Sequence, residues 1–465
     1  MLFRIFNLHI RVPLALLALL EASLFVLAPH LVTWLGMGSF GDDLGTSSKP
    51  VLVGSIVFAV LGFVSLMAMG LYSIRQRNDA TGIAVRIVAA IGAAVVLSAL
   101  VFYFLPNVGI GRRTLFMAAF IAVVLTLALR LLIVRRMGKE FFKRRVLVYG
   151  AGQRAACLLA LRRRSDTRGF RLVAFVAAEG DNVTVPSDRL VRRPPDLFRW
   201  SMEHEIDEVV LAMDDRRRDF PISELLECRL AGIDVLELAG FLERETGKVR
   251  LDVTNPSWII LGEGFRESPS LLVMERMFDA LVSLLLLIPV LPLMLLTAVA
   301  IRLEDGWRAP VFYRQVRVGR HNQPFSILKF RSMREDAEEE GAVWALPRDP
   351  RITRVGACIR RTRIDELPQL INVLRGDMSF VGPRPERPEF VEQLSKSIPY
   401  YRSRHAVKPG ITGWAQLCYP YGASDKEALE KLQYDLYYVK HRSLILDLAI
   451  VVQTVEVVLW GKGAR

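Results

Sequence analysis

The chain has 465 residues, and its mean hydropathy of +0.30 is high for a water-soluble protein. Its net charge of +13 suits nucleic acid, anionic lipid headgroups or phosphate-bearing substrates. No zinc-finger spacing, RNA-binding aromatic motif or long basic tail occurs in the sequence, so we expect no nucleic acid partner. The four cysteines form no CxxC pair, which argues against the usual zinc sites and disulfide frameworks. Any metal should be a hard ion held by carboxylates and phosphates.

Four apolar runs come first, each close to the roughly 20 residues that cross a bilayer as a helix. They cover residues 12–35, 51–74, 82–105 and 114–134. Cytoplasmic flanks of such helices are rich in Lys and Arg, and a basic cluster follows the fourth run. The sequence therefore predicts four transmembrane helices within residues 1–143, with the N-terminus and everything after residue 135 in the cytoplasm. Arg112 and Arg113 in the third loop oppose this orientation.

Short apolar runs then alternate with helical segments over residues 144–265, which predicts a parallel sheet with crossover helices. The expected strands are 144–150, 171–177, 208–213 and 233–238.

Gly150 and Gly152 open a turn between the first of these strands and a helix, where backbone amides could cradle a pyrophosphate. The third glycine of that pattern is replaced by Ala155, and no acidic residue ends the second strand cleanly. No Tyr-x-x-x-Lys pair is present to support short-chain-dehydrogenase chemistry. We favour a scaffold or regulatory domain, with nucleotide binding as the alternative, and we expect no catalysis here.

A long apolar stretch at residues 271–301 contains Pro289 and Pro292, which remove helical hydrogen bonds and bend the chain. If this stretch crossed the bilayer, the basic region after it would lie outside the cytoplasm, away from nucleotides. We predict a helix–break–helix that enters and leaves on one face, with an ordinary kinked spanning helix as the alternative. Residues 426–465 end in an apolar helix interrupted by Asp447, which should be amphipathic and partly buried.

The region between these two segments is rich in cations. Lys329 and Arg331 alternate along an expected strand, so both should lie on one face, where paired cations suit phosphate oxygens. A solvated strand face is an equally weighted alternative. Arg361 belongs to a dense basic run, and Arg384 stands between two prolines that fix the backbone around it.

Asp365 and Glu366 are the strongest catalytic candidates. Adjacent residues on a helix point about 100° apart, so the two carboxylates suit separate roles at one phosphate. One would attack phosphorus and the other would hold a metal. The alternative is that Asp365 caps a helix that has Pro368 in its first turn. The surrounding Arg and Lys residues favour the catalytic interpretation.

Two further polar residues belong to this region. Asp377 follows the helix stop at Gly376, and Thr412 lies in a rigid turn with small hydroxyl and amide donors. Such loops hold ligands more often than cores.

Residues from about 271 to 465 resemble the bacterial sugar transferase domain of monotopic polyprenyl-phosphate glycosyl-1-phosphate transferases. The matching stretches are VFYRQVRVGR, FSILKFRSM, DPRITRVG, DELPQLINVLRGDMSFVGPRP, HAVKPGITGWAQ and EKLQYDLYYVKHRSLILDL. The N-terminal helices and the α/β segment resemble the long form of this family. YPYGAS and GKGAR resemble members tied to exopolysaccharide export.

The fold class implied is a mixed membrane protein with three domains. These are a four-helix transmembrane bundle (1–143), a cytoplasmic Rossmann-like α/β domain (144–265) and a mostly helical catalytic domain with a re-entrant helix (266–465). The family's re-entrant helix breaks at a proline, best matched by Pro292. Leu291 and Arg363 stand where the family often has serine.

The resemblance also implies a two-step transfer of a sugar-1-phosphate from a UDP-sugar to polyprenyl (undecaprenyl) phosphate. Asp365 would attack the sugar-bearing phosphate and release UMP, and the lipid phosphate would then take the phosphosugar from an aspartyl intermediate. Glu366 would bind Mg²⁺. Lys329, Arg331 and Arg384 would bind phosphate charge. The donor suggested by the resemblance is UDP-glucose or UDP-galactose.

The implied location is the bacterial inner membrane, in contact with its lipid, with the catalytic domain on the cytoplasmic face. A homodimer is one expected assembly. A non-catalytic nucleotide-binding sensor and a transporter are the competing functions. Retention of Asp365 and Glu366 argues against the sensor, and five apolar segments are few for a transporter.

Overall fold

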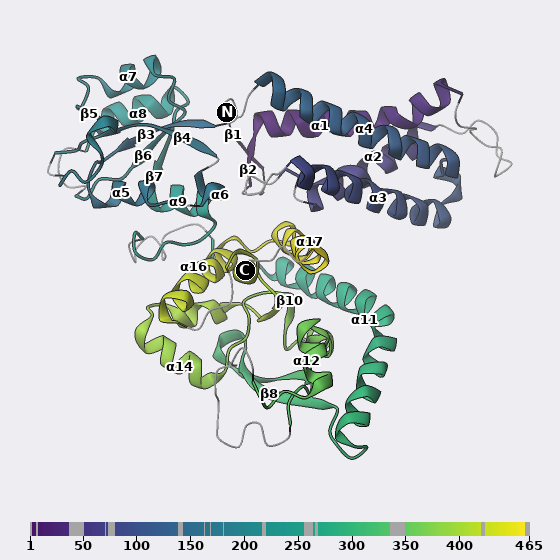
Figure 1. The fold of residues 1–465 in the computed structure, drawn as a ribbon. Helices are drawn as coiled ribbons and strands as arrows, with labels where there is room; N and C mark the ends of the chain where they lie inside the picture. Colours follow the sequence, from purple (N-terminus) through teal and green to yellow (C-terminus); the bar gives the residue numbers. More distant parts are fainter. Residues whose placement is uncertain are drawn as a thin grey trace. The chain divides into compact units, whose positions relative to one another are not determined.

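The computed structural model describes residues 2–5, 8–36, 51–69, 71–72, 80–137, 143–161, 163–167, 169–179, 181–215, 220–254, 264–265, 268–334, 349–419 and 424–460. The chain divides into two compact units, Met1–Thr246 and Gly247–Arg465 (Figure 1). The second unit thus begins before the residue 266 expected from the sequence. Val249 explains this, because its amide donates to Gln433 O at 2.9 Å and its side chain packs against Leu432 and Leu436.

The first unit opens with four long helices, preceded by a small antiparallel hairpin that the sequence analysis did not anticipate. The hairpin is β1 (Leu2–Ile5) with β2 (Leu8–Arg11), and the helices are α1 (Val12–Trp34), α2 (Val51–Ala68), α3 (Ala80–Phe104) and α4 (Arg112–Met137). By length and composition α1, α3 and α4 can cross a membrane, while α2 has a shorter apolar segment, Leu52–Met67. The four predicted helices are therefore present.

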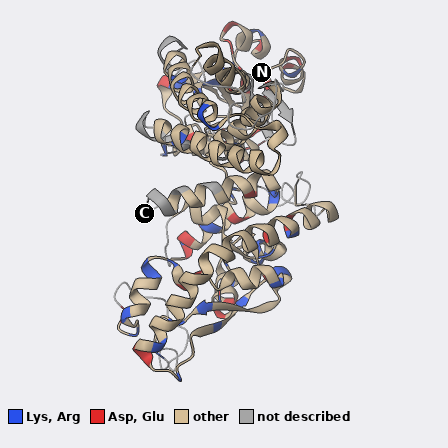
Figure 2. Cartoon of the chain, turned by 90° about the vertical axis from the view of Figure 1, so that its right-hand side faces the viewer, with Lys and Arg blue, Asp and Glu red and all other residues tan. Residues whose placement is uncertain are grey.

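Apolar contacts hold these helices together. Phe25 of α1 meets Phe58 of α2 edge to face, with ring centroids 5.5 Å apart. Gly62 lets α1 approach α2 closely, because a Cβ there would lie 2.7 Å from the Phe25 ring. Many leucines and valines on the same helices stay exposed, as expected of helices that face lipid. Long stretches of helix in Figure 2 carry neither acidic nor basic residues.

A buried ionic contact crosses this bundle. Glu21 of α1 is fully buried, and Arg130 of α4 donates to its two carboxylate oxygens at 2.5 and 2.9 Å. Tyr72, just beyond α2, donates to the same carboxylate. Charges in an apolar bundle persist when they are paired in this way, so the contact fixes which helix faces meet.

The rest of the first unit contains the predicted parallel sheet. Its strands are β3 (Arg144–Tyr149), β4 (Phe170–Val176), β5 (Leu190–Val191), β6 (Glu208–Leu211) and β7 (Asp234–Glu237), in the order β5-β4-β3-β6-β7. Numbered along the chain, this is the order 3-2-1-4-5, which matches five of the six strands of the classic doubly wound sheet. The two-residue edge strand β5 was not predicted.

Helices cover both faces of this sheet. Helices α7 (Leu197–Glu203) and α8 (Ile222–Leu230) lie on one face in Figure 1, and α5 (Gln153–Leu159), α6 (Arg164–Thr167) and α9 (Leu238–Thr246) lie on the other.

The second unit is mostly helical, as predicted, and has two small sheets. β8 (Phe312–Val318) pairs antiparallel with β9 (Pro324–Phe330), and β10 (Ser379–Val381) pairs parallel with β11 (Gly410–Thr412). Its helices are α11 (Pro269–Asp305), α12 (Arg354–Arg361), α13 (Gln369–Arg375), α14 (Pro388–Ser397), α15 (Trp414–Cys418), α16 (Asp425–His441) and α17 (Leu444–Trp460).

Helix α11 contains the predicted apolar stretch 271–301. Pro289 and Pro292 lie inside one continuous helix, which changes direction along its length in Figure 1. No segment outside the helix separates the parts before and after the two prolines. The bent helix is long and apolar enough to cross a membrane by length and composition.

Helix α17 confirms the prediction of a partly buried apolar helix. Ile450 is fully buried, whereas Ile445 and Leu448 are exposed. Asp447 is buried and accepts a hydrogen bond from the Tyr438 hydroxyl at 2.9 Å, which ties α17 to α16.

Candidate active site

Asp365 and Glu366 lie in a single 3-10 turn, Ile364–Glu366, between α12 and α13. Arg363 precedes the turn with a left-handed backbone, φ 59°, which reverses the chain after α12. Helix α13 begins at Gln369 and has Pro368 as its N-cap residue. The interpretation of Asp365 as a helix cap is therefore wrong, because the cap position falls three residues later.

Glu366 is surrounded by cations. Its Oε1 accepts from Arg384 Nη2 at 2.7 Å and from Lys329 Nζ at 3.2 Å, and Arg363 Nη1 lies 3.8 Å away. The Glu366 side chain is only 12% exposed. Although burial acts to raise it, the charges of Arg384 and Lys329 hold the pKa of Glu366 well below its usual range. Glu366 is thus ionised at every physiological pH.

Asp365 has a different environment. It is buried, and its Oδ1 has no hydrogen-bond partner within the described ranges. Burial and the neighbouring charge of Glu366 raise the pKa of Asp365, against the opposing charges of Lys329 and Arg360. A buried carboxylate oxygen without a partner is energetically costly, and a catalytic role is one explanation for such a group in a native structure.

Asn372 holds the strand that carries Lys329. Its Oδ1 accepts from the Leu328 amide at 2.9 Å, and its Nδ2 donates to Ser326 O at 2.8 Å. The Asn372 side chain on α13 therefore holds β9 beside the 3-10 turn that carries Asp365 and Glu366. Sequence reasoning missed Asn372, although an asparagine inside a short helix is the kind of residue whose amide bonds neighbouring backbone.

Arg384 lies in the rigid loop that follows β10. The loop is held closely against β11, because a Cβ on Gly382 would lie 2.4 Å from Lys408 O, and the Gly382 amide donates to Thr412 O at 2.8 Å. Arg404 donates to Arg384 O at 3.0 Å and so holds the backbone of the phosphate-binding candidate itself.

Arg404 is in turn held by buried partners that sequence reasoning also missed. It forms an ion pair with Asp435 of α16 at 2.8 Å and donates to the Tyr401 hydroxyl at the same distance. Burial acts against the charge of Arg404, yet Asp435 and Tyr401 raise its pKa above the ordinary value. A permanently charged Arg404 thus ties the Arg384 loop to α16.

Four other predicted residues, two of them cations, lie outside this group. Strand β9 ends at Phe330, one residue before Arg331, and the guanidinium of Arg331 pairs with Asp305 at 2.7 Å. Arg361 is exposed on α12, whereas its neighbour Arg360 acts on the pKa of Asp365.

Thr412 and Asp377 also take structural positions. Thr412 is buried and its hydroxyl lies 2.7 Å from that of Thr454, which ties β11 to α17. Asp377 accepts from Asn372 at 3.2 Å beyond the end of α13. The structure therefore gathers Asp365, Glu366, Lys329 and Arg384 out of the predicted set.

Three backbone amides in the glycine turn of the α/β domain are already bonded to carboxylates. Asp214 accepts from the Gln153 and Arg154 amides, each at 3.0 Å, and Asp181 accepts from the Ala151 amide at 2.8 Å. A Cβ on Gly152 would lie 1.9 Å from Asp214 Oδ2. A pyrophosphate at Gly150 and Gly152 would have to displace these two carboxylates, which favours the scaffold interpretation.

Comparison with known proteins identifies the family to which this chain belongs. Residues 270–461 match the family described as bacterial sugar transferase. Over 328 residues the chain is 34% identical to the UDP-glucose:undecaprenyl-phosphate glucose-1-phosphate transferase of Klebsiella pneumoniae, and the match covers 69% of this chain and 68% of that one. The chain belongs to the bacterial sugar transferase family.

Two further relatives match this chain over different shares of their length. A UDP-N-acetylgalactosamine-undecaprenyl-phosphate N-acetylgalactosaminephosphotransferase from Aeromonas hydrophila is 44% identical over 241 residues, 52% of this chain and 56% of that protein. The exopolysaccharide production protein PSS of Rhizobium leguminosarum bv. phaseoli is 41% identical over 202 residues, 41% of this chain and 98% of that protein. The match thus spans little more than half the length of the Aeromonas protein.

The family match contains all the residues that build the carboxylate site. Lys329, Asp365, Glu366, Arg384 and Arg404 lie within residues 270–461. The glycine turn and the N-terminal helices lie outside this range.

Proposed function

We propose that this protein transfers a sugar-1-phosphate from a UDP-sugar to polyprenyl phosphate and releases UMP. The observation that carries the proposal is the pair Asp365 and Glu366, one with an unbonded buried oxygen and the other surrounded by cations. The Klebsiella and Aeromonas relatives are named as transferases that act with undecaprenyl phosphate, which supports the same acceptor here. Their names give different sugars, so the donor sugar is a matter for experiment.

In the first step Asp365 is the nucleophile. An Oδ atom of its carboxylate forms a bond to the phosphorus that carries the sugar, and the bond from that phosphorus to the oxygen of UMP breaks. UMP leaves with both electrons of that bond, and an aspartyl-phosphosugar remains on the enzyme. Asp365 is suited to this role because no described hydrogen bond occupies its Oδ1.

In the second step an oxygen of polyprenyl phosphate attacks the same phosphorus. The bond to Asp365 breaks, the carboxylate is regenerated, and the product is a polyprenyl diphosphate sugar. Phosphoryl transfer depends mainly on positioning and charge neutralisation. Lys329 and Arg384 supply positive charge beside the reacting group, and Arg404 keeps the Arg384 loop in place.

The donor set also suits Mg²⁺. This ion usually keeps several waters and is held by one or two carboxylates together with substrate phosphates. Within the described ranges no group of three or more His, Cys, Asp or Glu forms a complete protein cage. Asp365 and Glu366 instead offer two neighbouring carboxylates, one with an unbonded oxygen. Glu366 would hold the ion, which would supply charge neutralisation at the diphosphate when bound.

The proposed location is the cytoplasmic face of the bacterial inner membrane, where UDP-sugars are available. The exposed apolar residues of α11 would lie in lipid, and we favour a re-entrant course for this bent helix because it keeps the catalytic residues on the cytoplasmic side. The name of the Rhizobium relative supports a role in exopolysaccharide assembly. A homodimer of the full chain is part of this proposal and can be tested by mass photometry.

The test is UMP release by the full chain with undecaprenyl phosphate, Mg²⁺ and a panel of UDP-glucose, UDP-galactose and UDP-N-acetylgalactosamine. We expect one donor to release UMP, and we expect Asp365→Asn to abolish release. Asp252→Asn is the matched control, because Asp252 is an exposed carboxylate in the same unit. A wild type that releases no UMP with any donor would favour the alternative of a nucleotide-binding sensor.

A further inference from the structure

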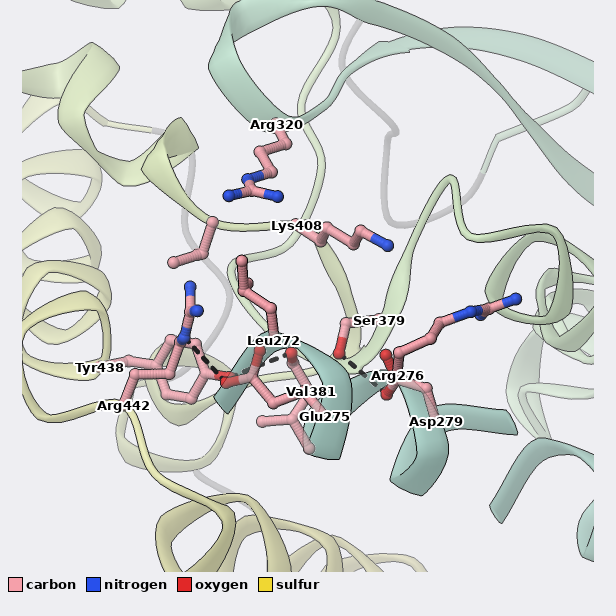
Figure 3. A pocket seen from close by; sticks show the side chains of 11 residues that line it. Leu272, Glu275, Arg276, Asp279, Arg320, Ser379, Val381, Lys408, Tyr438 and Arg442 are labelled. Carbon is pink, nitrogen blue, oxygen red and sulfur yellow. Dashed lines mark hydrogen bonds and ion pairs between the residues drawn. The ribbon is translucent and has the colours of Figure 1, made fainter. Parts of the chain in front are cut away.

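A second polar site lies between α11, β10 and the end of α16. It is a pocket with a cavity volume of about 80 Å³. Its lining combines four cations with two carboxylates and an apolar wall (Figure 3). The cations are Arg276, Arg320, Lys408 and Arg442, and the carboxylates are Glu275 and Asp279. Cations therefore outnumber carboxylates two to one around this space.

Both carboxylates already have partners in the protein. Glu275 pairs with Arg442 at 2.8 Å, and Asp279 accepts from the Ser379 hydroxyl at 2.9 Å and the Phe380 amide at 2.8 Å. The charges of Glu275 and Arg442 balance each other, whereas the two donors to Asp279 are neutral and leave its charge in place. Arg276, Arg320 and Lys408 outnumber this one remaining carboxylate, so the pocket has a net positive charge.

Lys408 and Arg320 lie across the pocket from the α11 side chains in Figure 3. No acceptor among the described residues lies within hydrogen-bond distance of Lys408 Nζ, and burial together with the charge of Arg276 lowers the pKa of Lys408. Arg320 begins the 3-10 turn Arg320–Asn322, and His405 Nδ1 lies 2.8 Å from Asn322 Oδ1 in the same turn. An anion in the pocket would supply the acceptor that Lys408 lacks.

The pocket is separated from the catalytic carboxylates by the length of α13. Arg276 donates to Val373 O and Leu374 O at the C-terminal end of this helix, while Asp365 precedes its N-terminal end. Seven helical residues span about 10 Å. An anion beside Lys408 would therefore not be the phosphate that reacts at Asp365.

The first turns of α11 connect this pocket to an apolar surface. Leu272, Glu275 and Asp279 face the pocket, whereas Val273, Met274 and Met277 are 60%, 51% and 68% exposed on the other side. An apolar face beside a cationic pocket is the arrangement that binds a lipid, with tails along the helix and the headgroup among the cations.

We propose that the pocket lined by Arg320 and Lys408 binds the phosphate headgroup of an anionic membrane phospholipid, distinct from the polyprenyl phosphate that reacts at Asp365. This site would anchor the start of α11 at headgroup depth. It depends on membrane association of α11 and not on the identity of the transferred sugar.

The test uses the full chain in nanodiscs of phosphatidylcholine with or without phosphatidylglycerol. Retained phosphatidylglycerol is measured by native mass spectrometry, together with the Tm. We expect phosphatidylglycerol to raise the wild-type Tm, and we expect Lys408→Gln and Arg320→Gln to weaken retention about fivefold each. Lys408→Arg keeps the charge and should keep the lipid. Lys396→Gln, an exposed lysine on α14, is the matched control.

Three outcomes would overturn the proposal. Retention by Lys408→Gln equal to that of the control would mean that the pocket holds no lipid. Displacement of phosphatidylglycerol by inorganic phosphate at equal concentration would assign the site to a free anion. A changed KM for polyprenyl phosphate with unchanged phosphatidylglycerol retention would assign it to the acceptor. If Lys408→Gln fails to fold in phosphatidylcholine, the proposal is decided by comparing phosphatidylglycerol retention in Arg320→Gln with that in Lys408→Arg.

Discussion

Asp365 and Glu366 share one 3-10 turn, yet the pKa of Asp365 is raised and the pKa of Glu366 is lowered. The cause is geometric, since Arg384 and Lys329 both bond to Glu366 Oε1, while Oδ1 of Asp365 has no bonded partner among the described residues. Glu366 is thereby held by two cations, whereas Asp365 keeps an oxygen without a described partner.

This difference predicts opposite effects on stability. The raised pKa of Asp365 means that its ionised form opposes folding at pH values above its unfolded pKa, so Asp365→Asn should raise the Tm at pH 7. The lowered pKa of Glu366 gives stability that is present above its unfolded pKa and lost as pH falls through the folded value. Glu366→Gln should therefore cost about 3–5 kcal/mol at pH 7, because it leaves two cations without their carboxylate.

Thermal unfolding of both variants at pH 7 and pH 4 checks this prediction. The two changes should shift the Tm in opposite directions at pH 7, and the difference should shrink at pH 4. Equal destabilisation by both would contradict the assignment of separate environments.

The rate of UMP release should fall as the pH is lowered. Asp365 must be ionised to attack, and its pKa lies above the usual value for an aspartate, so release should drop as pH falls through that raised pKa. Arg360→Gln removes a charge that lowers the pKa of Asp365, and the acid limb should move to higher pH. Arg375→Gln, an exposed arginine at the end of α13, should leave the limb in place. An unmoved limb in Arg360→Gln would show that another group controls it.

Arg404 should act as a positioning residue for Arg384. Arg404→Lys keeps the charge beside Asp435 but loses part of the bonding to Tyr401 and to Arg384 O. A small displacement of the Arg384 loop should lower kcat by about 10- to 100-fold with little change in KM. Steady-state UMP release measures both constants, and Arg402→Lys on the exposed side of the same segment is the control. A purely structural Arg404 would lower the Tm without separating kcat from KM.

Asn372 should contribute to stability through β9. Asn372→Ala leaves the Leu328 amide and Ser326 O without their partners, and each unsatisfied group costs about 1–3 kcal/mol when buried. Urea unfolding should show a lower midpoint. UMP release by the folded fraction should also fall, because Lys329 lies on the same strand. An unchanged midpoint would mean that water replaces both bonds.

The core of the candidate site could be predicted from local sequence. Asp365 and Glu366 are adjacent, and their basic surroundings predicted a phosphate site. The structure places Lys329 and Arg384 in contact with Glu366. The four apolar helices and the parallel sheet could also be predicted from the sequence, because the length and the apolar pattern of a segment determine such elements.

Other features depend on contacts between distant parts of the chain. Arg404 and Asp435 form one buried pair although 30 positions separate them, and neither stands in a pattern that predicts the other. The sequence placed Arg331 on the alternating face of β9, but the strand ends one residue earlier. The guanidinium of Arg331 instead forms an ion pair with Asp305 at the end of α11. Pro289 and Pro292 predicted a break, whereas the helix bends and continues.

The most direct test of the account omits the lipid acceptor. The full chain is incubated with the active UDP-sugar and Mg²⁺, and UMP release and the intact protein mass are followed together. The account predicts one UMP per active site and a mass increase of one phosphosugar, located on the peptide that contains Asp365 and absent in Asp365→Asn. Continuous UMP release without any adduct, or an adduct that persists in Asp365→Asn, would contradict Asp365 as the nucleophile.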